Sequence, residues 1–256
     1  MKTIAIITGA SSGMGSEFAK TVKCGGEFDE VWLIARRKEK LEEVCKTVPF
    51  SVKILPFDLT DRENLKRIGE LLENEKPNVA LLVNCSGFGK FEATEDTPLS
   101  VNLNMTDLNC NAVAAMCQMC LKYMSRGAHI INISSLAACQ PIPYINVYAA
   151  TKAFVLSYSR ALHREVRSRG ICVTAVLPFW TKTEFFDRAV TEEKHIVKKY
   201  VVMYEPEQIV KRAWRDSMRG KDVSKFGFTA RFQMALTKIL PHSFVMFYWM
   251  KQQKLK

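Results

Sequence analysis

Residues 3–15 read TIAIITGASSGMG, in which an apolar, β-branched run leads into a turn with three glycines and then into a helical pattern. Gly9 permits a tight turn, Gly13 lets the backbone approach a ligand, and Gly15 lets the helix pack closely on the strand. Free backbone amides at the start of that helix attract an anion. This order is typical of a pyrophosphate site for a dinucleotide, although glycine-rich turns also occur for structural reasons alone. The residues expected to contact the cofactor here are Gly9, Ser11, Ser12, Gly13, Met14 and Gly15.

Further β-branched runs follow and alternate with amphipathic stretches of roughly 10 to 25 residues. Strands joined through helices form βαβ units, whose right-handed crossovers build a parallel sheet with helices on both faces. The sequence therefore predicts an α/β fold of the Rossmann type, a doubly wound parallel sheet, in a single domain over residues 1–256. We expect its core at 1–178, a substrate cap at about 179–205 and a basic helical tail at about 206–256. The predicted strands are residues 3–7, 31–35, 52–57, 79–84, 129–134 and 171–177.

The composition favours a globular protein of a reducing compartment. With 256 residues, 48% of them hydrophobic, the chain can bury a full core. Its eight cysteines lack the spacing of a disulfide framework, and the apolar N-terminal run at 4–7 is too short for a signal peptide, so we expect a cytoplasmic protein. Cys117 and Cys120 have a metal-like spacing, but no second pair accompanies them and the four histidines form no ligand set. No metal is predicted.

The basic charge lies almost wholly near the C-terminus. Residues 194–256 hold 14 Lys and Arg against 4 Asp and Glu, which accounts for +10 of the net +11. Such a segment can steer anionic substrates or contact an acidic membrane, but a solvated basic helix face is commoner, and we expect no nucleic-acid partner. The apolar piece at 244–250 is far shorter than the ~20 residues of a membrane-spanning helix. With His242, Lys251 and Lys254 around it, this piece either docks onto protein or makes a peripheral membrane contact.

Polar residues follow the second, third and fourth predicted strands, at the edge of the sheet where ligands of such folds bind. Arg36 and Arg37 stand where an NAD-binding protein carries an acidic residue for the ribose 2′-hydroxyl. Because a guanidinium matches a 2′-phosphate, NADP(H) is favoured over NAD(H), unless both arginines are a solvated strand end. Asp58 is placed to reach the adenine, and Asn84 and Gly87 follow the fourth strand. Each of these three could equally be a helix cap or a turn residue.

Tyr148 and Lys152 are four residues apart in an apolar, helical run and so share one helix face. A phenol, with a pKa of about 10, is a poor acid or base at neutral pH unless a neighbouring cation stabilises its anion. Ser134 and Ser135 end the fifth predicted strand, where a hydroxyl could stabilise charge on a substrate oxygen. The pattern favours acid–base chemistry at an oxygen atom, although tyrosine and lysine at this spacing also occur by chance in many helices.

Together these residues resemble the short-chain dehydrogenase/reductase family, over about residues 3–183. Two places depart from the family pattern, since Cys85 and Ser86 replace its Asn-Ala pair and Phe179 replaces a glycine. The resemblance rests on Thr8, Gly9, Gly13, Gly15, Asp58, Leu59, Asn84, Gly87, Asn111, Ile133, Ser134, Ser135, Tyr148, Lys152, Pro178 and Thr183, which stand in the family's order and spacing.

The resemblance implies a role for each of these positions. Tyr148 would be the general acid in reduction and the base in oxidation, and Lys152 would lower the pKa of Tyr148 and bind the nicotinamide ribose. Ser135 would hold the substrate oxygen, and Asn111 would anchor a water in the proton relay. Beyond the glycine-rich turn, the cofactor would be held by Arg36, Arg37, Asp58, Leu59, Asn84, Gly87, Tyr148, Lys152, Pro178, Thr181 and Thr183.

These inferences predict an NADP-dependent oxidoreductase that interconverts a carbonyl and a secondary alcohol, as a homodimer or homotetramer. An aromatic-rich cap favours a bulky apolar substrate such as a steroid or bile acid, and a fatty-chain or xenobiotic carbonyl would suit the same pocket. These side chains could instead only pack the cap onto the core, and a non-catalytic NADP(H) sensor or scaffold is the alternative from another class. The side chains expected around the pocket are Phe88, Phe91, Ile142, Tyr144, Phe179, Trp180, Phe185, Phe186, Val201, Val202, Met203 and Tyr204.

Overall fold

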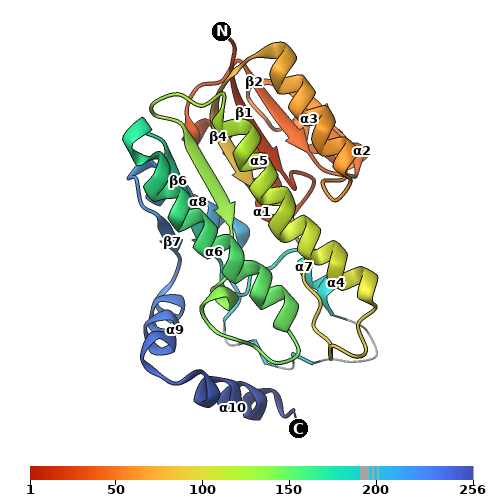
Figure 1. Ribbon diagram of the computed structural model, residues 1–256, viewed down its shortest axis with the longest axis vertical. Helices are drawn as coiled ribbons and strands as arrows, with labels where there is room; N and C mark the ends of the chain where they lie inside the picture. The colour runs from red at the N-terminus through yellow and green to blue at the C-terminus, as the bar shows by residue number, and fades with distance from the viewer. Residues whose placement is uncertain (191–195, 198, 201, 256) are drawn as a thin grey trace.

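The computed structural model describes residues 1–190, 196–197, 199–200 and 202–255. Its centre is a seven-stranded parallel sheet with the strand order β3-β2-β1-β4-β5-β6-β7 (Figure 1). The direction of the order reverses between β1 and β4, so the doubly wound α/β fold that the sequence predicts is confirmed. The strands are β1 (Thr3–Thr8), β2 (Glu30–Ile34), β3 (Ser51–Leu55), β4 (Asn78–Asn84), β5 (His129–Ile133), β6 (Cys172–Leu177) and β7 (Val223–Lys225).

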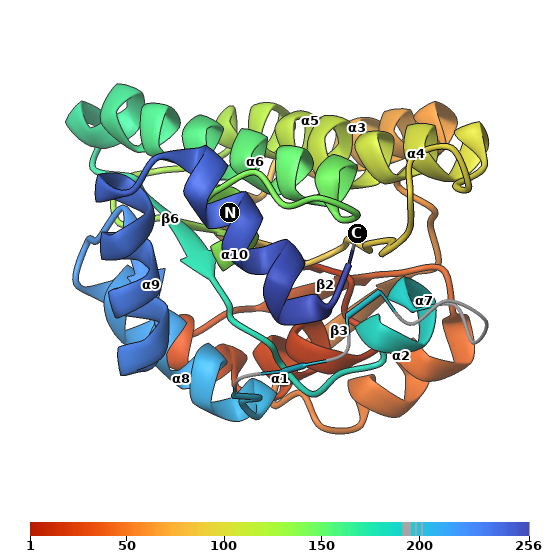
Figure 2. The same ribbon diagram turned by 90° about the horizontal axis from the view of Figure 1, so that it is seen from below.

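Helices cover both faces of the sheet. The α-helices that the structure describes are α1 (Gly13–Lys20), α2 (Lys38–Cys45), α3 (Arg62–Glu75), α4 (Leu99–Thr106), α5 (Ala112–Leu121), α6 (Asn146–Val166), α7 (Phe185–Ala189), α8 (Pro206–Met218), α9 (Phe228–Ile239) and α10 (His242–Gln253). α3, α5 and α6 pack on one face, and α1, α2 and α8 on the other, as the two layers in Figure 2 show. Successive residues of β1 alternate between these cores, because side chains of a strand point to opposite faces. A sheet covered on both sides needs continuous apolar strands, which is why the sequence predicts six of them to within two residues.

The core extends well beyond residue 178, where the sequence pattern predicted its end. The Trp214 ring of α8 meets Phe18 of α1 edge-on, with 5.2 Å between ring centres, and its Nε1 donates to Thr21 Oγ1 at 3.0 Å. Strand β7 pairs in parallel with β6. A core of 1–178 with a tail from about 206 is therefore wrong, because α8 completes one helical layer and β7 completes the sheet.

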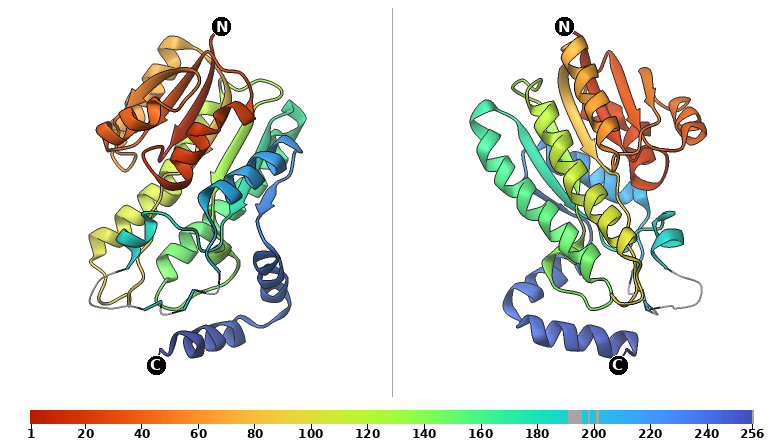
Figure 3. Two further views of the ribbon diagram at one scale, coloured as in Figure 1. Left: turned by 180° about the vertical axis from the view of Figure 1, so that it is seen from behind. Right: turned by 45° about the vertical axis from the view of Figure 1, so that its right-hand side comes forward.

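Helices α9 and α10 lie apart from these two layers. Figures 1 and 3 show them beyond the carboxyl ends of the strands, with α10 crossing that end of the molecule. Ala230 and Met234 of α9 pack against Leu136, and Trp249 Nε1 of α10 donates to the carbonyl oxygen of Pro143 at 3.2 Å. In the described part of the chain no helix combines the length and the apolar character needed to cross a membrane.

Candidate active site

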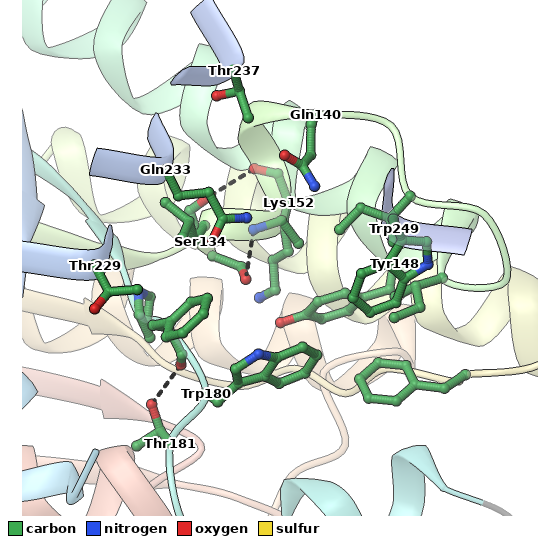
Figure 4. Close-up of a pocket in the computed structure, with 18 of the residues that line it drawn as sticks. Ser134, Gln140, Tyr148, Lys152, Trp180, Thr181, Thr229, Gln233, Thr237 and Trp249 are labelled. Carbon is green, nitrogen blue, oxygen red and sulfur yellow. Dashed lines mark hydrogen bonds between the residues drawn. The ribbon is translucent and has the colours of Figure 1, made fainter. Parts of the chain in front are cut away.

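A cavity of about 540 Å³ opens at the carboxyl ends of β4, β5 and β6. Its walls come from the segment after β5, from α6, from the cap after β6 and from α9 and α10 (Figure 4). Ser135, Tyr148 and Lys152 all line it. In Figure 4 the ammonium of Lys152 and the hydroxyl of Tyr148 point toward one another. The residues that the sequence predicts to be catalytic, apart from Asn111, therefore meet in one cavity.

Lys152 is buried in α6, with 5% of the residue exposed. Its Nζ donates to the carbonyl oxygen of Ile133 at 2.9 Å and lies 5.7 Å from the centre of the Tyr148 ring. Burial lowers the pKa of Lys152 to about 8, against an opposing effect of the nearby thiols of Cys85 and Cys110. A cationic group shifted this far toward its neutral form, in a cleft, is typical of functional sites.

Tyr148 precedes Lys152 by one turn of α6 and faces the cavity. Burial raises the pKa of its phenol to about 12, and a hydrogen bond with Ser135 opposes that rise. Lys152 is not among the causes of this shift, so its expected lowering of the Tyr148 pKa stays a prediction. Desolvation dominates, because the cation is itself buried and is bonded to a carbonyl. Tyr148 is therefore held in its protonated, acidic form at neutral pH.

The two serines after β5 differ in role, because side chains of adjacent residues point to opposite faces of a strand. Ser134 is buried, and its Oγ donates to the carbonyl oxygen of Lys152 at 2.7 Å, which ties β5 to α6. The Ser135 hydroxyl bonds to Tyr148 and accepts from the backbone N–H of Ala137 at 3.1 Å. The structure thus brings Ser135, and not Ser134, to the phenol.

Asn111 does not reach the site. Its side chain is exposed and its Nδ2 donates to Asp107 Oδ1 at 2.7 Å. Asn109 is buried instead: its Nδ2 donates to the carbonyl oxygen of Phe88 at 2.9 Å and to Thr151 Oγ1 at 3.0 Å, and its Oδ1 accepts from the N–H of Phe88 at 3.1 Å. The expected placement of Asn111 is therefore wrong, and Asn109 is the asparagine that lies against α6, at Thr151.

The sequence carried a signal for this choice. Asn109 begins a buried stripe continued by Ala112, Val113 and Met116, at the 3–4 spacing of one helix face. A π-helical turn over Asp107–Asn111 joins α4 to α5, and such distortions often occur at functional sites. Beside it, a Cβ on Gly87 would stand 2.9 Å from Asn109 Oδ1, so a glycine is what lets this amide approach.

The glycine-rich turn closes tightly on its own backbone. A Cβ on Gly15 would stand 2.0 Å from the carbonyl oxygen of Gly9, and one on Gly9 would stand 2.7 Å from the nitrogen of Ser86. Gly13 has φ +54°, a left-handed conformation that favours glycine, and faces Thr183 of the cap. The turn thus has no room for side chains where a phosphate has to approach the backbone. The other residues predicted for this turn are Ser11, Ser12 and Met14, of which Met14 lines the cavity.

Arg36 and Arg37 follow β2 beside this turn, and each guanidinium is about half exposed. Arg37 Nη2 donates to Ser11 Oγ at 3.3 Å and to Glu184 Oε2 at 2.8 Å, and the latter bond lowers the pKa of Glu184. Arg36 Nη1 lies 3.6 Å from Asp58 Oδ2. Arg37 therefore joins the glycine-rich turn to the residue before α7.

The remaining residues predicted to bind the cofactor differ in accessibility. Asp58 Oδ1 accepts from the N–H and the hydroxyl of Thr60 at 2.9 and 2.8 Å, and the carboxylate stays partly exposed. Leu59 is buried in the core, and Asn84 is buried with its Nδ2 donating to Asn132 Oδ1 at 2.9 Å. Both side chains are therefore engaged inside the protein, and the prediction that Leu59 and Asn84 bind the cofactor is left to their backbone groups.

The cap surrounds Tyr148 with aromatic rings. The ring centres of Phe91 and Phe185 lie 6.3 and 5.4 Å from that of Tyr148, and a Cβ on Gly89 would stand 2.7 Å from the Phe185 ring. Phe88 instead packs under the Arg188 guanidinium at 3.7 Å, and Val201 lies outside the described residues. The predicted residues that line the cavity are Phe91, Ile142, Pro178, Phe179, Trp180, Thr181, Thr183, Phe185 and Phe186.

The sequence did not predict that α9 and α10 form a wall of this cavity. Aromatic residues at helical spacing in 228–248 were the available signal. Opposite them, Gln140 is 9% exposed, and its Oε1 has no hydrogen-bond partner among the residues that the structure describes. An open acceptor in an apolar wall offers a site for a donor group of a ligand. The residues contributed by the two helices include Thr229, Phe232, Gln233, Leu236, Thr237, Phe244, Val245, Tyr248, Trp249 and Gln252.

Comparison with known proteins agrees with this geometry. Residues 3–194 match the family model for the short chain dehydrogenase. The chain is 34% identical over 193 residues to a very-long-chain 3-oxoacyl-CoA reductase of Anas platyrhynchos. It is 35% identical over 187 residues to 17-beta-hydroxysteroid dehydrogenase type 3 of Mus musculus. Each match takes in 70% of this chain and spans about 60% of the length of the relative.

Among solved structures, a short-chain dehydrogenase from Sphingobium yanoikuyae in complex with NADPH superposes with a TM-score of 0.77 at 26% sequence identity. The superposition covers 94% of this chain and 96% of that one. The family model covers most of the residues, and the similar structure extends over nearly all of them. With this fold and this site geometry, the chain belongs to the short-chain dehydrogenase family.

Proposed function

We propose that the protein is an NADP-dependent oxidoreductase that interconverts a carbonyl and a secondary alcohol. The observation that carries this proposal is the hydrogen-bonded pair of Tyr148 and Ser135 at the wall of the cavity, with the buried ammonium of Lys152 beside it. A protonated phenol and a hydroxyl that converge on one point are the donors that a developing alkoxide needs.

The residues present fit a nicotinamide dinucleotide phosphate. The glycine-rich turn lies at the N-terminus of α1, where backbone amides favour a pyrophosphate, and a Cβ on Gly9 or Gly15 would clash with backbone. Arg36 and Arg37 would take the 2′-phosphate as charge-assisted partners. Thr181 and Thr183, at the cavity wall, would hold the carboxamide end. When bound, the cofactor supplies or accepts the hydride at the substrate carbon.

In the direction of reduction, Tyr148 donates its phenolic proton to the carbonyl oxygen while the carbonyl carbon gains the hydride. Ser135 donates a hydrogen bond to the same oxygen, so that the charge developing there is stabilised before the proton arrives. In oxidation the phenolate takes the proton from the alcohol. The pKa of Tyr148, raised to about 12 by burial, keeps the phenol protonated, which is the form that reduction requires at the start of the reaction.

Lys152 and Asn109 position these groups. The Lys152 ammonium, fixed on the carbonyl of Ile133 at 2.9 Å, is the cation nearest to the phenol and the one able to stabilise its anion. Asn109 ties the segment after β4 to α6 through Phe88 and Thr151. We assign to Asn109 the proton-relay role that the family resemblance had placed on Asn111.

The substrate we propose is a bulky apolar carbonyl or alcohol, such as a steroid or bile acid. A cavity of about 540 Å³ with Phe91, Trp180, Phe185 and Phe186 around the phenol supports this class. Burying apolar surface contributes about 25 cal/mol per Å², which favours large ketones over small polar ones. The names of two relatives, a very-long-chain 3-oxoacyl-CoA reductase and a hydroxysteroid dehydrogenase, also support a long or rigid apolar substrate. A fatty-chain carbonyl is therefore the second candidate.

The test follows NADPH absorbance with purified protein and a panel of steroid, bile-acid, fatty-chain and sugar-sized carbonyls. We expect turnover of the bulky apolar compounds, and Tyr148→Phe should lower kcat by about 10² to 10⁴ while NADPH binding, read by its fluorescence, is kept. Equal kcat/KM for sugar-sized carbonyls would contradict the apolar substrate. A wild-type protein that binds NADPH but turns over none of the panel would instead favour a sensor or scaffold.

A further inference from the structure

Helices α9 and α10 present an exposed apolar surface, which we call the C-terminal face. On α9 it consists of Phe228, Phe232, Leu236 and Ile239, at the spacing of one helix side, and on α10 of Phe244, Phe247 and Tyr248. The most exposed members are Phe228 at 81%, Ile239 at 80% and Phe247 at 63%. Single exposed apolar residues need no explanation, but seven on two consecutive helices form a patch that indicates a partner surface.

The charge around the C-terminal face has one sign. Residues 223–256 contain six Lys and Arg and no Asp or Glu. Lys251 follows Phe244, Phe247 and Tyr248 on the same side of α10, and its side chain is exposed. Arg231 on α9 and Lys254 at the end of α10 are exposed as well. A partner for this face has to accept aromatic rings and also carry negative charge.

The C-terminal face is continuous with the candidate active site. Phe232 and Leu236 of α9 and Phe244 and Tyr248 of α10 each line the cavity while 40% to 61% of the residue stays exposed. The views in Figures 2 and 3 place both helices at the outer end of the molecule, beyond the carboxyl ends of the strands. The rim of the cavity and the exposed aromatic surface are thus partly the same residues.

We propose that the C-terminal face docks on the surface of an anionic lipid bilayer. Aromatic and aliphatic side chains on one side of a helix, flanked by lysine and arginine, are the features with which a helix lies in a membrane interface. Each helix has 12 residues and is about 18 Å long, too short to span a bilayer, so both lie along its surface. A second copy of this chain is the weaker occupant, because two such faces would bring together like charges without a compensating carboxylate.

Docking in this way would open the cavity toward the lipid rather than toward water. An apolar substrate dissolved in the bilayer would then reach Tyr148 through the rim formed by Phe232, Leu236, Phe244 and Tyr248. This consequence for substrate delivery rests on the proposed function, whereas the docking itself does not.

The test is sedimentation of the full chain with vesicles of 70% phosphatidylcholine and 30% phosphatidylserine, against vesicles of phosphatidylcholine alone. We expect binding to the anionic vesicles that weakens as salt is raised. Ile239→Asp with Phe247→Asp removes two exposed members of the face that do not line the cavity, and should lower binding at least tenfold. Lys251→Gln with Lys254→Gln should lower it roughly thirtyfold, since each basic residue near such a surface contributes about 1 kcal/mol.

The matched control is Leu99→Asp, which changes a leucine that is 73% exposed at the start of α4 and should leave binding unchanged. All variants are first compared with wild type by circular dichroism and thermal melting. Tyr148→Phe should bind vesicles like wild type, so failure of the proposed chemistry and failure of docking are distinguishable. The proposal is overturned if wild type does not sediment with anionic vesicles, or if Leu99→Asp loses as much binding as the other variants. It is also overturned if Ile239→Asp with Phe247→Asp dissociates an oligomer while vesicle binding persists.

Discussion

Replacing Lys152 by methionine should change stability in a way that depends on pH. The buried ammonium has a pKa lowered from 10.5 to about 8, so the folded state holds its charge less readily than the unfolded chain. At about 1.4 kcal/mol per pKa unit, this difference destabilises the folded state by about 3 kcal/mol below pH 8. The cost fades as pH rises from 8 toward 10.5, because the folded protein has lost this proton while the unfolded chain still binds it, so unfolding takes up a proton and becomes less favourable at higher pH. Relative to Lys152→Met, the wild type should therefore gain about 2 kcal/mol in free energy of unfolding between pH 7 and pH 9.5.

The assay is urea unfolding of both proteins at the two pH values, with the difference between them taken at each pH. The bond from Lys152 Nζ to the carbonyl of Ile133 is worth about 1.5 to 3 kcal/mol with the charged donor at pH 7 and about 1 kcal/mol with the neutral donor at pH 9.5, so its loss in the variant offsets part of this gain. Lys122→Met removes an exposed lysine and should show the same difference from wild type at both pH values. A difference between wild type and Lys152→Met that stays constant, or that shifts toward the variant at pH 9.5, would refute the reasoning. The variant should also lose most of its turnover.

The other expectations concern single side chains of the site. Asn109→Ala should lower kcat and cost about 2 kcal/mol or more of stability, because it leaves buried backbone groups of Phe88 unpaired. Asn111→Ala should keep kcat and stability near those of wild type. Equal effects of the two variants would return the role to Asn111. Arg36→Ala should lower the ratio of kcat/KM for NADPH over NADH at least tenfold, and an unchanged ratio would remove the 2′-phosphate from this residue. Gln140→Leu should raise KM for a steroid with a hydroxyl far from the reacting carbonyl, but not for its deoxy analogue, if the open Oε1 accepts that hydroxyl.

Much of the fold could be read from residues 1–177 because its parallel strands are buried on both faces and therefore written as apolar, β-branched runs. The C-terminal end of the core could not be predicted in this way. Strand β7 has three residues and only one apolar side chain, too few to show the alternating pattern of a strand. Helix α8 resembled part of a basic tail, because its lysines and arginines alternate in sequence with its buried residues. The basic side chains of α8 lie on its outer side, whereas the buried Trp214 packs the helix against α1.

The site shows the same division. Spacing along one helix face was enough to bring Tyr148 and Lys152 together, because four residues make about one turn whatever the tertiary context. Spacing could not predict the direction of the pKa shift of Tyr148, since that shift depends on desolvation by residues far away in the sequence, such as Phe185 of the cap. The 3–4 spacing of Asn109 to the apolar positions that follow it favours Asn109, but the family resemblance placed the role on Asn111, two positions further along the π-helical turn.

The hydrogen bonds of Arg37 to Ser11 and Glu184 have a consequence for the binding of an anion at this arginine. Glu184 stands one residue before α7, so a single guanidinium bonds both to the glycine-rich turn and to the start of that helix. An anion that binds Arg37 would compete with the Glu184 carboxylate for the same guanidinium. If it displaces that carboxylate, the bond between Arg37 and the start of α7 is lost. By thermodynamic reciprocity, an anion that weakens the bond between Arg37 and Glu184 by some factor would itself bind more weakly by the same factor while that bond is intact.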